Sequence, residues 1–294
     1  MIESIKSVDK YLYHYTKCET AIDFILKNNT FRLNNYNKTN DPKEVKDWQF
    51  NIGSNEGADL SKYCMNELSA WLTKELKEKT RLLCFSQDTD PLSGNHMIDI
   101  FNRGFCKPRM WAQYGDNHKG VCLVFDRNKL THQINDQLAH KHLVLASHVK
   151  YRNRNLIPNL FASDDQQYSI DIDHLQKHGK EQYVAHHLST HVERLFFEKM
   201  NDWSGESEWR YIVFSDSETD LYVNYGNSLV GVMFGNDTEE DDIISVMNMT
   251  NRTGVRHMGL KWKNCSPWYD YENLRYTGGI RNSAWGKHLR WHNK

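Results

Sequence analysis

The chain has 294 residues and a formal net charge of -1, with 37 Lys and Arg against 38 Asp and Glu. This balance excludes a protein that coats nucleic acid through overall positive charge, although it allows a local basic patch. No apolar run approaches the roughly 20 residues that span a membrane, and the cysteines form no CxxC pair. We therefore expect a soluble cytoplasmic protein with reduced thiols and no structural zinc site.

The predicted strands are short and rich in aromatic, β-branched or continuous apolar residues. They lie at 11–16, 30–35, 81–87, 119–126, 142–151, 207–214, 220–225 and 229–235. Helices are predicted at 17–29, 45–79, 109–115, 164–201 and 236–250, followed by an irregular tail. Because strands and helices mix without regular alternation, we expect an α+β fold rather than a doubly wound sheet. We expect a single domain over 1–294, with helical insertions at 45–80 and 164–201 and a basic, aromatic C-terminal segment at 275–294.

The first predicted strand, YLYHYT, places His14 and Thr16 on one face and Tyr13 and Tyr15 on the other. An imidazole can bind a hydroxyl or a phosphate, and a threonine can donate its hydroxyl. A single histidine on a strand is also commonly a core residue whose ring nitrogen is hydrogen-bonded. In the turn NDPKE, Asn40 and its acidic neighbours either contact a ligand or form an Asx turn that opens a helix at Pro42.

The stretch MWAQYGDNHKG places Trp111 about one helical turn before Tyr114, and His118 follows in a polar loop. An aromatic shelf beside a polar loop suits a planar ring such as nicotinamide. The alternative is that Trp111 packs the helix onto the sheet, and for Tyr114 both interpretations stay open.

The histidines His187 and His191 are four residues apart, a spacing that can bind zinc. The HExxH order is absent, however, and surface helices often carry such pairs, so we predict no metal site. The acids at 237–242 are expected to open a helix, where the macrodipole favours negative charge.

The stretch WSGESEWRYIVF places Glu206 and Glu208 two residues apart at the start of a strand, with Arg210 behind them. On a strand both carboxylates point to the same side, and their repulsion predicts a raised pKa for one of them. The functional interpretation is a carboxylate site that handles a ribose hydroxyl and an acceptor. The alternative is an exposed strand start that Arg210 neutralises.

The last twenty residues contain no acid, and basic residues alternate there with tyrosine and tryptophan. Arg281, Lys287 and Arg290 are the candidates for contacts with nucleic-acid phosphates, with bases stacking on the aromatic rings. The alternatives are a solvated tail and a segment that docks onto the acids at 237–242.

Taken in order, the segments YHYT, NDPKE, LLCFSQ, MWAQYGDNHKGVCLVFD and EKMNDWSGESEWRYIVF resemble an uncharacterised bacterial family, known as a domain of unknown function. The resemblance runs from about Tyr11 to Gly235. The same layout is similar to the core of ADP-ribosyltransferases. In the branch that includes diphtheria toxin and the poly-ADP-ribose polymerases, a histidine lies on the first strand and a catalytic glutamate opens a later strand. His14 and Glu208 match these positions, and Glu206 adds the E-x-E pair of the arginine-modifying branch.

This resemblance implies an ADP-ribosyltransferase-like split sheet, mixed or antiparallel, and NAD as a substrate. Glu208 would hold the ribose hydroxyl and steady the oxocarbenium charge, Glu206 would orient or deprotonate the acceptor, and His14 would hydrogen-bond the adenosine ribose. The positions expected to contact NAD are His14, Tyr15, Thr16, Asn40, Phe85, Ser86, Trp111 and Tyr114. The third strand has Cys84, Phe85 and Ser86 where a clear tyrosine is expected, so the ring that stacks on nicotinamide stays open between Phe85 and Tyr114.

The resemblance also implies a bacterial toxin or phage-defence effector that modifies a nucleic acid, with RNA favoured, or a protein, and that has a possible antitoxin partner. Two other functions stay open. One is a non-catalytic nucleic-acid-binding or sensor domain that keeps the fold. The other is a nuclease or phosphotransferase that uses His14, His118 and Glu208.

Overall fold

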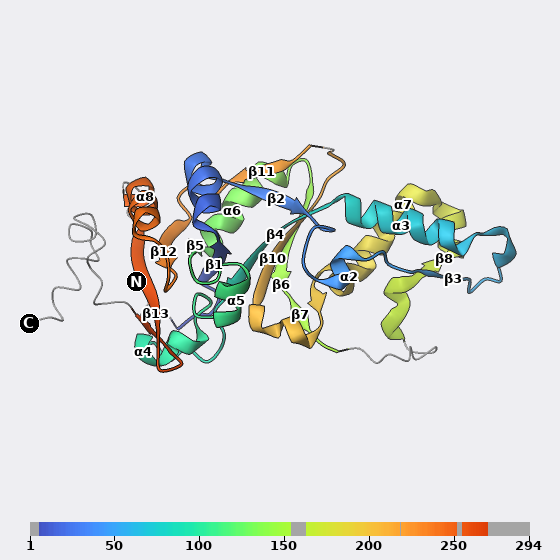
Figure 1. Ribbon diagram of the computed structural model, residues 1–294. Helices are drawn as coiled ribbons and strands as arrows, with labels where there is room; N and C mark the ends of the chain where they lie inside the picture. Colours follow the sequence, from blue (N-terminus) through green and yellow to red (C-terminus); the bar gives the residue numbers. More distant parts are fainter. Residues whose placement is uncertain (1–5, 154–162, 218, 252–254, 270–294) are drawn as a thin grey trace, which may run out of the picture.

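The structure is a computed structural model, which describes residues 6–153, 163–217, 219–251 and 255–269 (Figure 1). The strands are β1 (Tyr11–Thr16), β2 (Thr30–Asn35), β3 (Asn51–Gly53), β4 (Thr80–Gln87), β5 (Val121–Asp126), β6 (Leu143–His148), β7 (Lys150–Tyr151), β8 (Ser169–Asp171), β9 (Glu198–Lys199), β10 (Glu208–Phe214), β11 (Leu221–Asn224), β12 (Leu229–Phe234), β13 (Arg256–Lys263) and β14 (Ser266–Tyr269). The α-helices are α1 (Cys18–Thr20), α2 (Pro42–Val45), α3 (Met65–Glu78), α4 (His96–Asp99), α5 (Pro108–Gln113), α6 (Arg127–Leu138), α7 (Ile172–Phe196) and α8 (Glu240–Thr250). The π-helix is η2 (Ala21–Leu26), and the 3-10 helices are η3 (Leu60–Lys62), η4 (Ile100–Asn102), η5 (Ser163–Tyr168) and η6 (Asn201–Glu206).

A large mixed sheet forms the centre of the protein, in the strand order β11-β2-β4-β1-β5-β12-β13-β14. Strand β10 also pairs with β4, and β6 pairs with β10. The pairs are antiparallel except for β12 and β13, which run parallel. The predicted α+β class is therefore confirmed.

Both faces of the sheet are covered. Strand β5 is buried at every position, because β1 and β12 flank it and helices or loops cover each face. On one face, apolar side chains of η2, α6 and α8 pack on the sheet through residues such as Ile25, Ile134 and Val246. On the other face, the segment that contains α5 packs Trp111 and Phe105 against tyrosines of β1.

The sheet divides along β4, and this division positions the site described below. Strand β10 pairs with β4 from Thr80 to Ser86. On the opposite side, β2 pairs with β4 at Arg81 and Leu82, whereas β1 pairs with it at Ser86 and Gln87. Between these two short pairings, β1 and β2 part, and the middle of β4 is left facing the gap.

A helical lobe extends beyond β10, to the right in Figure 1, and contains α2, α3 and α7 with the small β3–β8 ribbon. Its core includes Trp48, Leu72 and Phe196 and continues onto the sheet at Leu82. The predicted helix over 45–79 is wrong at its start, because residues 51–53 pair with 169–171 and the α-helix begins at Met65. The predicted helix over 164–201 is also shorter, since β8 and β9 flank α7 and Gly179 breaks it at φ 76°.

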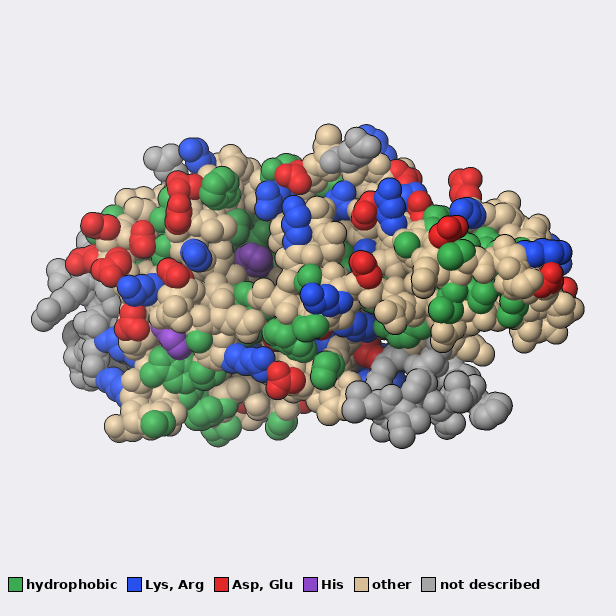
Figure 2. Space-filling view, turned by 45° about the vertical axis from the view of Figure 1, so that its right-hand side comes forward, with side chains coloured by type: hydrophobic (Ala, Val, Ile, Leu, Met, Phe, Trp, Pro, Cys, Tyr) green, Lys and Arg blue, Asp and Glu red, His purple; other side chains and the backbone are tan. Residues whose placement is uncertain are grey.

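Three further elements correct the sequence prediction. Helix α6 was not predicted, because its alternating polar residues give it little apolar character outside Leu130, Ile134 and Leu138. The predicted irregular tail contains β13 and β14, which gain their order from pairing with β12 and with each other. The acids at the start of α8 do open a helix, as expected, and Figure 2 shows acidic side chains gathering at that end of the molecule.

Candidate active site

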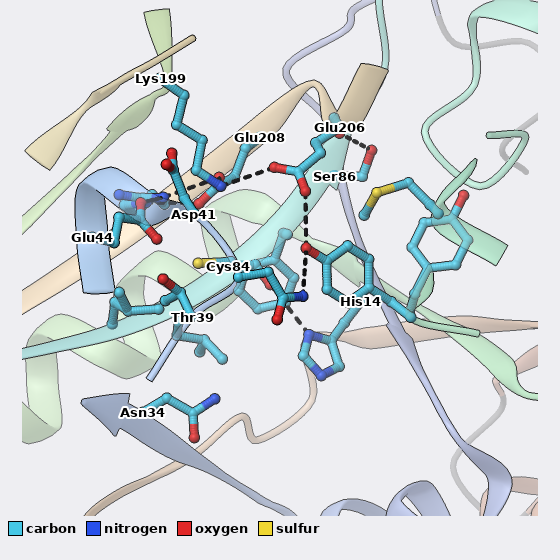
Figure 3. A pocket seen from close by; sticks show the side chains of 18 of the residues that line it. His14, Asn34, Thr39, Asp41, Glu44, Cys84, Ser86, Lys199, Glu206 and Glu208 are labelled. Atoms are coloured by element: carbon cyan, nitrogen blue, oxygen red, sulfur yellow. Dashed lines mark hydrogen bonds and ion pairs between the residues drawn. The ribbon is translucent and has the colours of Figure 1, made fainter. Parts of the chain in front are cut away.

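A cavity of about 220 Å³ lies where β1 and β2 part along β4. Its lining comes from β1, β2, β4, the turn before α2, the end of α5, β9, η6 and the start of β10. Eight of the residues singled out in the sequence line it: His14, Tyr15, Asn40, Phe85, Ser86, Tyr114, Glu206 and Glu208. Figure 3 shows His14, Ser86, Glu206 and Glu208 converging from separate elements.

The two glutamates reach the cavity through a sharp turn. Glu206 ends η6, Ser207 adopts a left-handed conformation (φ 45°, ψ 57°), and Glu208 begins β10. Strand β4 fastens this turn, because Ser86 Oγ donates to the Glu206 carbonyl at 2.7 Å and the Gln87 amide donates to the Ser207 carbonyl at 2.9 Å. The prediction that both glutamates lie on one strand is therefore wrong for Glu206, which the turn brings to the same cavity by another route.

Neither carboxylate is exposed, so the alternative of a solvated strand start is wrong: the exposed fractions are 3% for Glu206 and 4% for Glu208. Arg210 binds Glu208 through Nε (2.7 Å) and Nη2 (3.1 Å), and it also contacts Glu44 Oε1 at 2.5 Å. Lys199 Nζ lies 2.9 Å from Glu206 Oε2 and 2.8 Å from Glu208 Oε2. Figure 3 shows Lys199 between the two glutamates. We call these five residues the cavity cluster.

The cations decide the ionisation of this cluster. Burial acts to raise the pKa of Glu208, but the charges of Arg210 and Lys199 outweigh it and lower this pKa to about 2. The predicted raised pKa is thus wrong for Glu208, because the like-charge repulsion is offset by two buried cations. Burial acts to lower the pKa of Lys199, and the carboxylates of Glu208, Glu44 and Glu206 raise it well above its usual value. Three glutamates face two cations, so one negative charge is in excess.

His14 is held as a neutral ring at the opposite wall of the cavity. Its Nδ1 lies 3.2 Å from the Cys84 carbonyl, which can only accept, so Nδ1 carries the proton and Nε2 is left as an acceptor. Phe31 and Phe85 flank the ring, with centroid distances of 4.9 and 5.5 Å. Burial lowers the pKa of His14 to about 4, although the bond to Cys84 acts the other way. At neutral pH the ring can therefore accept a hydrogen bond from a ligand.

Tyr114 supplies the aromatic wall beside the glutamates. Its hydroxyl donates to Glu206 Oε1 at 2.9 Å and accepts from Asn40 Nδ2 at 3.5 Å. Burial and then the Glu206 charge raise the pKa of Tyr114, so it remains a donor. Phe85 is only 2% exposed and packs mainly against core rings. Between the two candidates for stacking, Tyr114 has the more accessible ring.

Several predicted residues lie away from the cavity. Trp111 is fully buried and donates through Nε1 to the Phe105 carbonyl at 2.8 Å, and Thr16 is also absent from the cavity lining. His118 stacks near Trp111 and accepts from Trp262 Nε1, so it is not brought to His14 and Glu208. Arg281, Lys287 and Arg290 lie outside the described residues.

The histidine pair of α7 has a structural environment. His187 is buried, and its Nε2 lies 3.0 Å from the Gln167 carbonyl, while His191 packs beside its ring. Within residues 6–153, 163–217, 219–251 and 255–269, no group of three His, Cys, Asp or Glu side chains is arranged to hold a metal ion. The same ranges contain no helix that combines the length and apolar character needed to cross a membrane.

Sequence reasoning missed Lys199, although it lies in the segment EKMNDWSGESEWRYIVF, because it was placed inside the predicted helix over 164–201 as one of many lysines. Asn34 and Thr39, which were not predicted, also line the cavity, as do Asp41 and Glu44, the acidic neighbours of Asn40 for which ligand contact was left open. The local signal for this last group was the Asx turn, which the structure contains: Asp41 caps α2 by accepting from the Lys43 amide at 2.9 Å. The turn chemistry and the cavity lining are thus properties of the same short segment.

Comparison with known proteins finds a match to one family over part of the chain and no activity. Residues 110–211 match the family described as protein of unknown function (DUF2971). The predicted similarity to an uncharacterised family is therefore confirmed over that segment, which contains Tyr114, Lys199 and both glutamates but not His14. No curated protein and no solved structure matches the chain.

Proposed function

We propose that the protein is an NAD-dependent ADP-ribosyltransferase with an ADP-ribosyltransferase-like division of its sheet. The observation that carries this proposal is the convergence of His14, Tyr114, Glu206 and Glu208, from four separate elements, on one cavity. A half-buried histidine on a first strand, facing one glutamate that begins a later strand and another just before it, is the arrangement that such a transferase requires.

The electrostatics of the cavity favour this chemistry. NAD carries a cationic pyridinium ring, and cleavage of the nicotinamide–ribose bond develops positive charge on the ribose carbon. The cavity cluster has one carboxylate in excess over its cations. It can therefore stabilise positive charge on a bound substrate, and such fixed charges act most strongly where water is excluded. A phosphate group in the same position would meet net repulsion.

The roles of the residues follow from their contacts. Glu208 holds the ribose 2′-hydroxyl and steadies the oxocarbenium charge while nicotinamide leaves with the bonding electron pair. Glu206 orients the acceptor and takes the proton that the acceptor loses as its new bond to the ribose carbon forms. His14, neutral and with Nε2 unprotonated, accepts a hydrogen bond from a hydroxyl of the adenosine ribose.

The remaining cavity residues suit the nicotinamide end of NAD. Tyr114 provides the ring for stacking, and Asn40, Ser86 and the Tyr15 backbone provide polar groups for the carboxamide. The cavity volume of about 220 Å³ is below the roughly 300–1,000 Å³ of typical ligand pockets. It therefore takes one ring and one sugar, and the adenosine end extends toward β1 and the protein surface.

We further propose a bacterial toxin or phage-defence effector that modifies a nucleic acid, with RNA favoured, or a protein. The support is the resemblance in motif order together with the basic, aromatic composition of residues 275–294. An antitoxin is a possible partner on the same grounds.

The test is incubation of the full chain with NAD labelled on its adenosine, in separate reactions with RNA, DNA and protein pools. We expect label transfer to one pool and release of nicotinamide, and Glu208→Gln should reduce both by about 100-fold or more. Glu193→Gln is the matched control, because this exposed glutamate pairs with Lys150 at the surface. The proposal is overturned if the folded protein labels no pool, or if Glu208→Gln labels as well as wild type.

A further inference from the structure

Lys199 enters the cavity from a position that the backbone fixes. It belongs to β9, which follows α7 and pairs in parallel with β7. The Arg152 amide donates to the Lys199 carbonyl at 3.0 Å, and the Lys150 amide donates to the Phe197 carbonyl at 2.8 Å. The side chain, 7% exposed, then runs beside the ring of Trp203 to the glutamates. A long flexible side chain is thereby held in one place.

The contacts of Lys199 differ from those of the other cavity cation. Lys199 Nζ bridges Oε2 of Glu206 and Oε2 of Glu208, at 2.9 and 2.8 Å. Arg210 instead joins Glu208 to Glu44. Two carboxylates that share one nitrogen within 3 Å lie close enough to repel strongly, and without a cation between them one would take up a proton.

We propose that Lys199 is a positioning residue of this site: by bridging Glu206 and Glu208 it keeps both carboxylates ionised and fixes their separation. This inference rests on the proposed transferase function for its kinetic consequence, although the bridge itself does not. The bridge leaves Glu206 Oε1 with the Tyr114 hydroxyl and Glu208 Oε1 with Arg210 Nε, so each carboxylate is held at both ends.

Other titratable groups line the same cavity, among them the exposed Lys38. Carboxyl groups of Asp41 and Glu44 approach from the α2 segment and only add negative charge. The other polar neighbours are Tyr114 from α5, Tyr151 from β7, Cys84 from β4 and His14 from β1. Burial raises the pKa of Tyr114, Tyr151 and Cys84, and it lowers the pKa of His14, so all four are neutral at pH 7. Arg210 already forms ion pairs with Glu208 and Glu44. The cation that pairs with Glu206 is therefore Lys199.

The kinetic test compares Lys199→Met, Lys199→Gln and Lys199→Arg with wild type across pH. In wild type Glu208 is ionised well into the acid range. Without the ammonium, the pair holds a proton at higher pH, so the acid limb of the kcat profile should move upward by about one pH unit or more. Lys199→Arg should return the limb to near its wild-type position. A merely structural role would lower kcat equally at every pH, and that result would overturn the proposal.

A second measurement is independent of turnover. Glutamate labelled with carbon-13 at its carboxyl allows NMR titration of the free protein, with Glu206→Gln and Glu208→Gln assigning the two signals. We expect one of the two to titrate at higher pH in Lys199→Gln, which keeps hydrogen-bond donors but no charge and serves if Lys199→Met does not fold. Unchanged titration in Lys199→Gln would overturn the bridge. If wild type turns over no NAD, the transferase proposal fails, whereas the titration still decides the bridge.

Discussion

Two buried ionic clusters in the described part of the chain have a similar balance of acids and cations but differ in their surroundings. The sealed cluster consists of Asp88, Asp99 and Arg103, with side-chain exposures of 0, 1 and 0% respectively. Like the cavity cluster, it has one acid more than it has cations. In the sealed cluster, however, main-chain amides complete the coordination: Gly104 donates to Asp88, and Ser93 and Gly94 donate to Asp99, at 2.7–2.8 Å.

The two clusters differ in the groups that donate hydrogen bonds to their carboxylates, and this difference separates a structural cluster from a candidate site. In the sealed cluster the main-chain donors belong to residues 88–104, the same segment that contains the charged side chains. The charges therefore hold this segment on the sheet and offer no free group to a ligand. In the cavity cluster, the side chains of Lys199, Arg210 and Tyr114 hold the carboxylates, and these carboxylates line an open space. Burial and ion pairing are common to both clusters, so neither property alone identifies a site.

The largest effect on stability is expected from Arg103→Met. This change leaves Asp88 and Asp99 buried without their cation, which typically costs about 3–5 kcal/mol of unfolding free energy. Urea denaturation followed by circular dichroism measures it. Arg32→Met is the matched control, since Arg32 pairs with Asp220 at the surface and should cost less than about 1 kcal/mol. Equal effects of the two substitutions would show that the sealed cluster does not stabilise the fold.

The sequence predicted most of the sheet, because the strands that line its centre have continuous apolar or alternating patterns. It missed β3, β13 and β14, whose order depends on pairing with distant residues rather than on local composition. The helix over 45–79 is likewise shortened by the pairing of residues 51–53 with 169–171, whereas the break at Gly179 is a local positive-φ conformation that glycine permits. Local propensity is a weak guide wherever a partner strand decides the conformation.

The site was predictable where a motif marked it and not elsewhere. His14, Tyr114 and the glutamate pair stood in recognisable order, and the cavity brings them together. Lys199 was placed in the predicted helix over 164–201, where a lysine is ordinarily solvated, and only the fold shows that it lies between two acids. The burial of the pair also escaped prediction, since a strand start with three charges has the composition of a surface.

The second largest effect concerns Glu208 of the cavity cluster, whose contribution to the unfolding free energy should depend on pH. The folded-state pKa of Glu208, about 2, is below its ordinary value of 4.5. Glu208 therefore contributes stability that is fully present above about pH 4.5 and is lost as the pH falls toward 2. In the Glu208→Gln variant the unfolding free energy should decline less steeply over this window. At pH 7 the substitution should lower the unfolding free energy by about 1–3 kcal/mol. Urea denaturation at pH 7, 4.5 and 3 measures both, and parallel curves for the two proteins would contradict it.

A smaller effect is expected at the opposite wall of the cavity. His14 has a folded-state pKa of about 4, below its ordinary 6.5, so the unfolded chain takes up its proton first as the pH falls. Stability from this group is present above pH 6.5 and lost toward pH 4. His14→Gln keeps a donor for the Cys84 carbonyl and should remove on the order of 1 kcal/mol of the decline between pH 7 and 5. A variant that declines as steeply as wild type would show that His14 is not held neutral.

The smallest effect on stability is expected from Tyr114→Phe, which removes only the hydroxyl that donates to Glu206 Oε1. Glu206 keeps Lys199, and its freed oxygen faces the cavity, where water can replace the lost donor. The cost should therefore be about 0.5–1.5 kcal/mol, well below that of Arg103→Met. If Tyr114 stacks on nicotinamide as proposed, the phenyl ring also preserves the KM for NAD, while kcat falls because Glu206 is less firmly held. A cost near that of Arg103→Met would mean that the cavity cluster is sealed from water as well, and the difference between the two clusters would then lie in their donors alone.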